Sequence, residues 1–162
     1  MIIMHSNLTS TSQNAFTLEN KSKLGEKKQG KVIYSIYEAI YLIENKKAQL
    51  IRNNKLLTLN QAIKSLLKSK NYQDSYLIFK DLRKRGYIPK AGLKFGADFR
   101  VYVKNEKHAK YLVHIVNEKD KIGFKELLAK TRVSHSTAKK LLIAIIDSQE
   151  DITYLEVDWM KM

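Results

Sequence analysis

The sequence has four histidines, and their spacing limits the kinds of catalytic site that the chain can build. They are His5, His108, His114 and His135, and they show no metal-ligand spacing with acidic residues. The chain has no cysteine, so a thiolate metal site and a disulfide framework are excluded. No glycine-rich phosphate loop with a following lysine is present, which argues against an NTPase. We therefore expect no metal site and no other cofactor.

The charge of the chain points to a polyanionic partner. There are 30 Lys and Arg residues against 16 Asp and Glu residues, a formal net charge of +14. A solvated surface needs charge but not an excess of one sign this large, so nucleic acid is favoured ahead of a membrane surface or an acidic protein. The alternative is a basic protein that has no anionic partner.

The most distinctive residues lie in the C-terminal half. They are the run KAGLKFGADFRVY (90–102), then KHAKYLVHIV (107–116), then SHSTAKKLLIAIID (134–147). Together with FKDLRKRGY (79–87), these blocks resemble the tRNA-splicing endonuclease family. A weaker likeness, IYEAIYLIE (36–44), lies in the N-terminal half.

The resemblance implies an active site. In the family, a tyrosine at the end of the GADFR-x-Y strand, a histidine a short loop later and the first lysine of the KK pair are catalytic. In this sequence they correspond to Tyr102, His108 and Lys139. Family members generally have a longer loop than Val103–Lys107, so the geometry around His108 stays open.

The chemistry of RNA suits these three groups. RNA carries its own nucleophile, the 2′-hydroxyl, so the enzyme must supply a base, an acid and positive charge at the phosphate. An imidazole retains a protonated fraction at neutral pH, which suits His108 as the acid. A tyrosine is a poor base unless nearby cations favour its phenolate, and Lys104, Lys107 and Lys139 are candidates. The expected products are a 2′,3′-cyclic phosphate and a 5′-hydroxyl, with no metal required.

Other residues have two interpretations each. Arg132 matches a family arginine that clamps a bulged base, and the alternative is a phosphate-contacting or solvated arginine. Trp159 either stacks on a base or belongs to an interface or the core. His114, in an apolar run, is interpreted as structural, and the role of His135 stays open.

The resemblance also implies a substrate and an assembly. Family substrates are precursor tRNAs with a bulge–helix–bulge that is cut twice, so a chain with one catalytic triad needs at least two copies. Family members of this length form tetramers, either of one chain or with structural subunits. The acidic hairpin Asp147–Asp151 and the closing strand Ile152–Trp159 are the expected contacts between copies.

Hydrophobic periodicity predicts the elements that position these residues. We expect helices over 34–46, from an N-cap at Thr58, and over 74–85 with Gly86 ending the last one. The segments Met1–Met4 and Ala15–Leu18 suggest a small edge hairpin or a frayed tail, with the hairpin preferred.

The C-terminal half has a different pattern. Strands are expected over 99–103, 111–116 and 152–159, and a helix over 123–132, while residues 133–146 begin another helix or run into a strand. We place a boundary near Asn71, with domains 1–72 and 73–162. The expected fold class is α/β (α+β), with a small helix-rich N-terminal α/β domain and a C-terminal mixed-sheet nuclease domain flanked by helices.

A rival interpretation exists for the C-terminal half. Residues 124–146 also look like a helix-turn-helix, which would make the protein a DNA-binding regulator. That interpretation leaves the strand at 99–103 and His108 unexplained. A non-catalytic structural subunit of the same family is a further alternative, but such a chain is expected to lack the triad.

The sequence indicates nothing that belongs in a membrane. The N-terminal residues lack a signal-peptide pattern, and no run approaches the roughly 20 apolar residues that span a bilayer. We expect a soluble, cytoplasmic protein.

Overall fold

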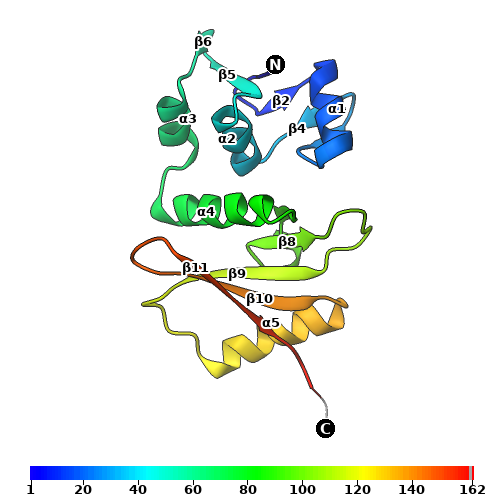
Figure 1. The fold of residues 1–162 in the computed structure, drawn as a ribbon, viewed down its shortest axis with the longest axis vertical. Helices are drawn as coiled ribbons and strands as arrows, with labels where there is room; N and C mark the ends of the chain where they lie inside the picture. The colour runs from blue at the N-terminus through cyan, green and yellow to red at the C-terminus, as the bar shows by residue number, and fades with distance from the viewer. Residues whose placement is uncertain (161) are drawn as a thin grey trace. The chain divides into compact units, whose positions relative to one another are not determined.

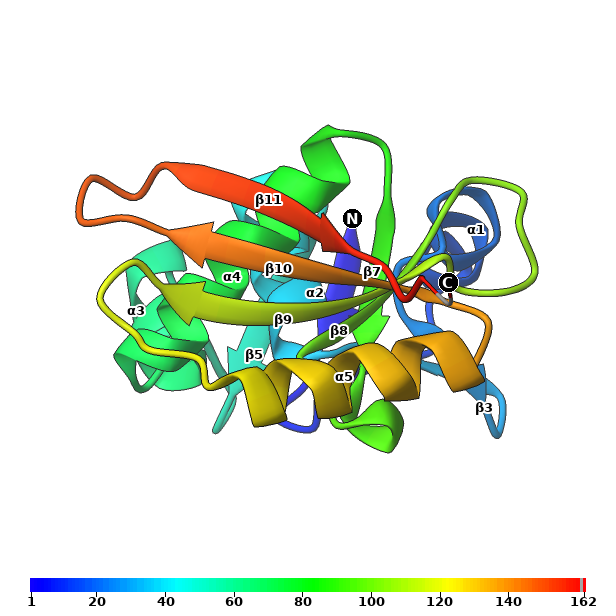
Figure 2. The ribbon, with the colours of Figure 1, turned by 90° about the horizontal axis from the view of Figure 1, so that it is seen from below.

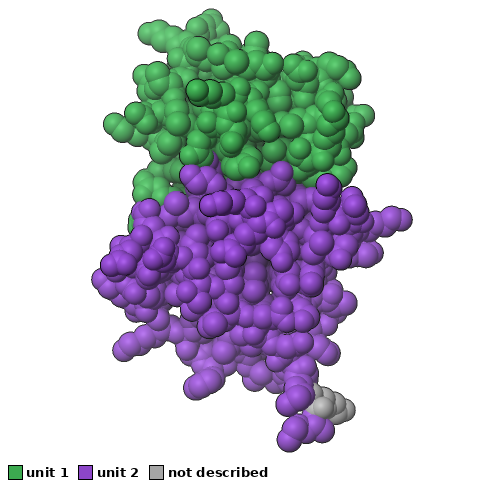
Figure 3. All heavy atoms as spheres, viewed as in Figure 1, with its two compact units in different colours: residues 1–73 green, residues 74–162 purple. Residues whose placement is uncertain are grey.

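The computed structural model describes residues 1–160 and 162, which divide into two compact units. Unit 1 comprises residues 1–73 and unit 2 residues 74–162 (Figure 3). Both contain helices and strands, which confirms the predicted α+β class. Within the described part of the chain, no helix has the length and apolar character that crossing a membrane requires.

Unit 1 contains two small sheets and three helices. One sheet has the order β1-β5-β6 and the other β2-β4-β3. The strands are β1 (Ile2–Met4), β2 (Thr9–Ser10), β3 (Glu26–Lys28), β4 (Lys31–Ile33), β5 (Ala48–Arg52) and β6 (Lys55–Leu56). The helices are α1 (Gln13–Ser22), α2 (Ile36–Glu44) and α3 (Leu59–Leu66).

Two of these helices begin at capping boxes, of which the one at Thr58 was predicted in part. Ser35 caps α2, and the side chain of Glu38 accepts the Ser35 N–H in return, at 2.9 Å. Thr58 caps α3 as predicted, with Gln61 as its reciprocal partner. Each box satisfies backbone donors that have no partner inside the helix.

The predicted N-terminal hairpin is wrong. Ile2–Met4 is a strand, but it pairs in parallel with β5, far along the chain. Ala15–Leu18 lies inside α1, where the Ser12 side chain accepts the N–H of Ala15 and starts the helix. The short apolar run could not by itself distinguish a strand from a helix, and the cap decided it.

Unit 2 is a five-stranded mixed sheet with a helix on each face. The strand order is β11-β10-β9-β8-β7, parallel only between β9 and β10 (Figures 1 and 2). The elements are β7 (Ile88–Ala91), the 3-10 turn η1 (Leu93–Phe95), β8 (Phe99–Tyr102), β9 (Tyr111–Asn117), α5 (Phe124–Ser136), β10 (Lys140–Ile146) and β11 (Ile152–Val157). The crossover from β9 to β10 runs through α5.

Helix α4 (Lys70–Lys84) covers one face of this sheet. Phe79 packs its ring against Phe99 of β8, with centroids 6.2 Å apart, and Asp81 accepts a hydrogen bond from Tyr154 of β11 at 2.8 Å. The helix begins four residues before the predicted Asp74, and the division between the units falls inside it. Its end was predicted correctly, since Gly86 takes a φ of 88° there.

Strand β7 forms one edge of the sheet and contains Pro89, the only proline. Pro89 lies opposite Val101, whose carbonyl faces β9 and accepts the N–H of Lys110 at 2.8 Å. Pro89 and Val101 are therefore a non-hydrogen-bonded pair, and the proline nitrogen points away from the sheet. The lack of an N–H on Pro89 therefore removes no hydrogen bond between β7 and β8.

The segment after α5 overturns the helix-turn-helix interpretation. Helix α5 continues to Ser136 and is followed by a turn and by strand β10, so residues 124–146 contain one helix only. β10 pairs with strands on both sides along its length. Leu141, Ile143 and Ile146 of this strand are buried in the sheet rather than presented on a recognition helix.

Candidate active site at one end of the sheet

The three residues proposed for catalysis lie at one end of the sheet of unit 2. The C-terminal end of β8, which carries Tyr102, lies beside the N-terminal ends of β9 and β10, because Tyr111 is the register partner of both Val101 and Lys140. The backbone of Lys110 connects the three strands by donating to Val101 and accepting from Lys140, at 2.8 and 2.9 Å. The loop that carries His108 and the turn that carries Lys139 both lie at this end (Figure 2).

Tyr102 ends β8 and is half-buried. Side chains alternate along a strand, so Tyr102 lies on the face opposite Phe99, which packs on α4. Its ring is 5.8 Å from the guanidinium of Arg100, two residues before it on the same face.

The loop before β8 explains the glycine and the aspartate of the motif. A Cβ on Gly92 would lie 2.7 Å from the carbonyl oxygen of Ala97, so only glycine allows this close turn. Asp98 accepts the N–H of Ile115 through its carboxylate at 2.8 Å and donates its own N–H to Val113 at 3.0 Å. Asp98 thus ties the entry of β8 to β9, a role that the motif contained but that was not assigned from the sequence.

His108 lies on the loop between β8 and β9 and is exposed. The loop turns tightly, with the N–H of Glu106 donating to Val103 at 3.2 Å, and Asn105 takes a φ of 70°. Ala109 is buried directly after the histidine. The short loop therefore closes over a few residues and leaves the imidazole exposed above the start of β9.

Lys139 lies in the turn between α5 and β10, and the strand expected as one of two alternatives for residues 133–146 begins directly after it. Its Nζ donates to the carbonyl of Thr137 at 2.7 Å and lies 4.9 Å from the centre of the Phe95 ring. The next lysine, Lys140, pairs instead with Glu156 on β11. Of the two adjacent lysines, Lys139 is the one without a carboxylate partner among the described residues.

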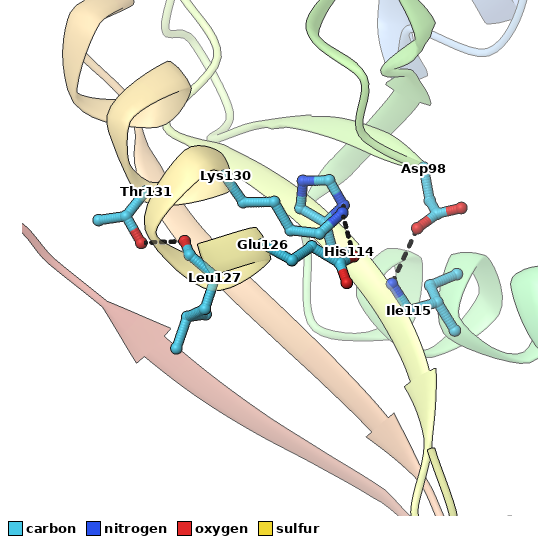
Figure 4. Close-up of polar contacts among 7 residues, drawn as sticks. All are labelled: Asp98, His114, Ile115, Glu126, Leu127, Lys130 and Thr131. Carbon is cyan, nitrogen blue, oxygen red and sulfur yellow. Dashed lines mark hydrogen bonds and ion pairs between the residues drawn. The ribbon is translucent and has the colours of Figure 1, made fainter. Parts of the chain in front are cut away.

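His114 is buried between β9 and α5, consistent with the structural interpretation (Figure 4). Its Nδ1 is 3.1 Å from the Nζ of Lys130, which also pairs with Glu126 at 3.3 Å. Burial lowers the pKa of His114 from the ordinary 6.5, and Lys130 lowers it further, while Asp98 and Glu126 act in the opposite direction. The neutral imidazole can accept a hydrogen bond from the ammonium of Lys130 and so tie α5 to the sheet.

Arg132, His135 and Trp159 form an aromatic and basic cluster at the same end of the sheet. The guanidinium of Arg132 lies 5.7 Å from the centre of the Trp159 ring, and the His135 ring lies 6.2 Å from it. Arg132 and His135 are three residues apart on α5, which places them on one face of the helix. Trp159 follows β11 and is 38% exposed, so it is not a core residue.

The acidic hairpin lies at the opposite end of the sheet. It joins β10 to β11, whereas the candidate site lies where β10 begins (Figure 2). The carboxylate of Asp147 accepts the N–H groups of Gln149 and Asp151 at 2.8 and 2.9 Å, so this residue shapes the turn. The full length of β10 therefore lies between the hairpin and Lys139. In the described residues, no group of three or more His, Asp or Glu side chains is arranged to hold a metal ion.

The comparisons with known proteins agree in pointing to one family. Residues 72–154 match the family described as "tRNA intron endonuclease, catalytic C-terminal domain". The chain is 39% identical to the tRNA-splicing endonuclease of Thermococcus kodakarensis, over 94% of its own length and 92% of that protein. It is 38% identical to the tRNA-splicing endonuclease of Methanothermobacter thermautotrophicus, over 89% and 86% of the two chains. The tRNA-splicing endonuclease of Sulfurisphaera tokodaii is 33% identical, over 88% and 82%.

Proposed function

The chain belongs to the tRNA intron endonuclease family, and on that premise we propose that it excises introns from precursor tRNA by cutting at a bulge–helix–bulge. The observation that supports this proposal is that the strand end, loop and turn that carry Tyr102, His108 and Lys139 lie at one end of the unit 2 sheet. Arg132 and Trp159 at the same end supply groups that bind unpaired bases.

The reaction begins with the 2′-hydroxyl beside the scissile phosphate. Tyr102, as the phenolate, accepts the proton of that hydroxyl, and the 2′-oxygen forms a bond to phosphorus. The bond from phosphorus to the 5′-oxygen breaks, and His108 donates a proton to the departing oxygen. The products are a 2′,3′-cyclic phosphate and a 5′-hydroxyl.

Lys139 stabilises the charge that develops on the phosphorane. Its Nζ is directed by the carbonyl of Thr137 and lies over the Phe95 ring, so little reorganisation is needed when the phosphate arrives. The three side chains supply both proton transfers and the positive charge. We therefore propose that cleavage needs no metal ion.

Arg132 and Trp159 would hold a bulged base by stacking. A guanidinium plane and an indole ring both stack on an unpaired base without reading its sequence. Their contact in this chain supports a joint role rather than two separate ones.

We further propose that the working enzyme is a tetramer, either of this chain alone or with a structural subunit. A bulge–helix–bulge is cut twice and each chain carries one triad, so at least two copies must act together. The edge strand β11 and the acidic hairpin are the proposed contacts between copies.

The test is to incubate the purified chain with end-labelled precursor tRNA in excess EDTA. We expect cleavage at both intron boundaries, with 2′,3′-cyclic phosphate and 5′-hydroxyl ends. Products with 5′-phosphate ends, or complete inhibition by the chelator, would identify a metal-dependent nuclease instead. Cleavage only after addition of a second protein would identify the heteromeric assembly.

A further inference from the structure

Unit 1 is the more basic of the two units although it contains none of the proposed catalytic residues. Residues 1–73 include 12 Lys and Arg residues against 4 Asp and Glu residues. Of the four carboxylates, Glu38 is buried, and Glu19 and Glu26 pair with neighbouring lysines. The positive charge of unit 1 is therefore largely uncompensated at its surface, which is a reason to look there for a binding site for an anion.

Unit 1 contains a cavity of about 320 Å³ between β5, α3 and the beginning of α4. Leu50 and Leu66 line its apolar part, while Arg52, Lys68, Ser65 and Tyr72 line its polar part. Tyr72 is 45% exposed, so much of its side chain is open to a ligand. All the lining residues belong to the described part of unit 1, and none is a carboxylate.

The guanidinium of Arg52 is held in place at this cavity. Its Nη1 donates to the Oγ of Ser65 on α3 at 2.6 Å. A guanidinium has five N–H donors in a fixed plane, so this single bond orients it and leaves donors for a ligand. Among the residues that the structure describes, no carboxylate forms an ion pair with Arg52 or Lys68. Two cations that line one cavity match the charge of a phosphate.

We propose that this cavity binds one nucleotide of an RNA strand, with Arg52 and Lys68 on its phosphate and the Tyr72 ring against its base. The inference rests on the proposed function, which supplies the RNA, and adds a contact in the unit that lacks the triad. The volume is near the lower end of the range for ligand pockets, about 300–1,000 Å³, which fits one nucleotide and not a duplex. Stacking on an aromatic ring combined with phosphate contacts is how single-stranded RNA is generally held.

The test compares two double variants with the same change of charge. In the cavity variant, Arg52→Gln is combined with Lys68→Gln, and in the control, Lys46→Gln with Lys47→Gln, which lie in unit 1 outside the cavity. Affinity is measured for a precursor tRNA with 2′-deoxy residues at both scissile positions, because this RNA lacks its nucleophile and stays intact. The cavity variant should bind at least about tenfold more weakly than the control, since hydrogen bonds to charged groups contribute about 1.5–3 kcal/mol each.

Two substitutions of Tyr72 test the base contact separately. Tyr72→Ala should weaken binding about tenfold, while Tyr72→Phe should stay within a few-fold of wild type, because stacking contributes about 1–3 kcal/mol per base. Equal losses in both double variants, or no loss in Tyr72→Ala, would overturn the proposal. So would a cavity variant that loses binding of adenosine 5′-monophosphate but keeps its affinity for RNA.

A cleavage assay separates this inference from the proposed function. At saturating protein, the cavity variant should cut ordinary precursor tRNA within a few-fold of the wild-type single-turnover rate, because the triad is unchanged. If the wild-type chain fails to cut both alone and with a structural subunit, the proposed function falls. The comparison of affinities for the uncleavable RNA still decides whether the cavity binds a nucleotide.

Discussion

At the scale of single residues, His108 is the group whose removal tests the mechanism most directly. His108→Ala should lower the single-turnover cleavage rate by about 10²–10⁴ and leave RNA affinity nearly unchanged, because proton donation is needed only in the transition state. His5→Ala is a suitable control, since His5 is exposed and lies in unit 1. A rate for His108→Ala within a few-fold of wild type would remove His108 from the mechanism.

His114 predicts a dependence of stability on pH. Burial and Lys130 lower its pKa in the folded protein below the ordinary 6.5, so the unfolded chain binds the proton more readily. The stability that neutral His114 contributes is therefore fully present above about pH 6.5 and is lost as the pH falls toward the folded pKa. The free energy of unfolding should decrease between pH 7 and pH 5 more steeply than other groups explain.

The variant His114→Asn checks this assignment. The asparagine oxygen can take the place of Nδ1 as acceptor for Lys130, but it does not titrate. Denaturant unfolding of this variant should show a smaller loss of stability on acidification, while His5→Asn should behave as wild type. If His114→Asn kept the full acid dependence, another group would be responsible.

At the scale of elements, the turn between α5 and β10 sets the position of Lys139. Ala138 takes a φ of 54° there, a left-handed conformation in which β-branched residues are strongly disfavoured. Ala138→Val should destabilise unit 2 by about 1–3 kcal/mol and slow cleavage by displacing Lys139. Ala138→Gly should be nearly neutral for both. Thermal unfolding and single-turnover cleavage measure the two effects, and equal unfolding temperatures for the two variants would contradict the strained turn.

Local signals explain which elements were predictable from the sequence. α2 followed from helical spacing, α3 from helical spacing and the cap Thr58, and the strand with Phe99 and Val101 from alternation. Segments whose partners are distant in sequence were predicted only in part. Ile2–Met4 pairs with β5, and residues 140–146 become a strand because β9 and β11 accept them on either side. Tertiary pairing overrides local preference at such places.

The candidate site was predictable in its members but not in its supports. The motif resemblance proposes Tyr102, His108 and Lys139 as its members. Which elements place these residues at one end of the sheet depends on strand order, which the sequence does not display. Asp98 is recognisable as a support only once Ile115 is known to be its neighbour. Lys130 likewise becomes a partner of His114 only when α5 packs on the sheet.

At the scale of the whole molecule, the position of the acidic hairpin supports a role in assembly. Because Asp147 shapes the turn, the test should leave it unchanged and combine Glu150→Gln with Asp151→Asn. We expect light scattering to show a shift toward smaller species and paired cleavage to decline, with residual cleavage at high protein concentration. The control, Glu26→Gln with Glu44→Gln, makes the same charge change in unit 1. Wild-type mass and activity in the hairpin variant would show that the hairpin is only a solvated turn.

The net charge of +14 predicts a strong effect of salt on RNA binding. Neutralising about six phosphates would reduce affinity by about 10³ between 50 and 200 mM salt through counterion release. The preference for bulged over fully paired RNA should change far less, because stacking by Arg132 is less screened than exposed lysine–phosphate contacts. Arg132→Lys keeps the charge but loses the planar group, so it should reduce the preference while keeping the salt dependence. If salt erased preference and affinity together, the stacking role would be wrong.

Pro89 has a consequence for how many copies of the chain can be joined through their sheets. A sheet with two complete edges can accept a neighbour on each side, and repeated pairing of that kind grows without limit into a fibre. In unit 2 the outward nitrogen of Pro89 leaves the β7 edge one donor short, whereas β11 at the other edge contains no proline. If two copies pair through β11 about a two-fold axis, the β11 edges of both are occupied by the same contact. No β11 edge is then left for a third copy, so pairing through this strand stops at a dimer.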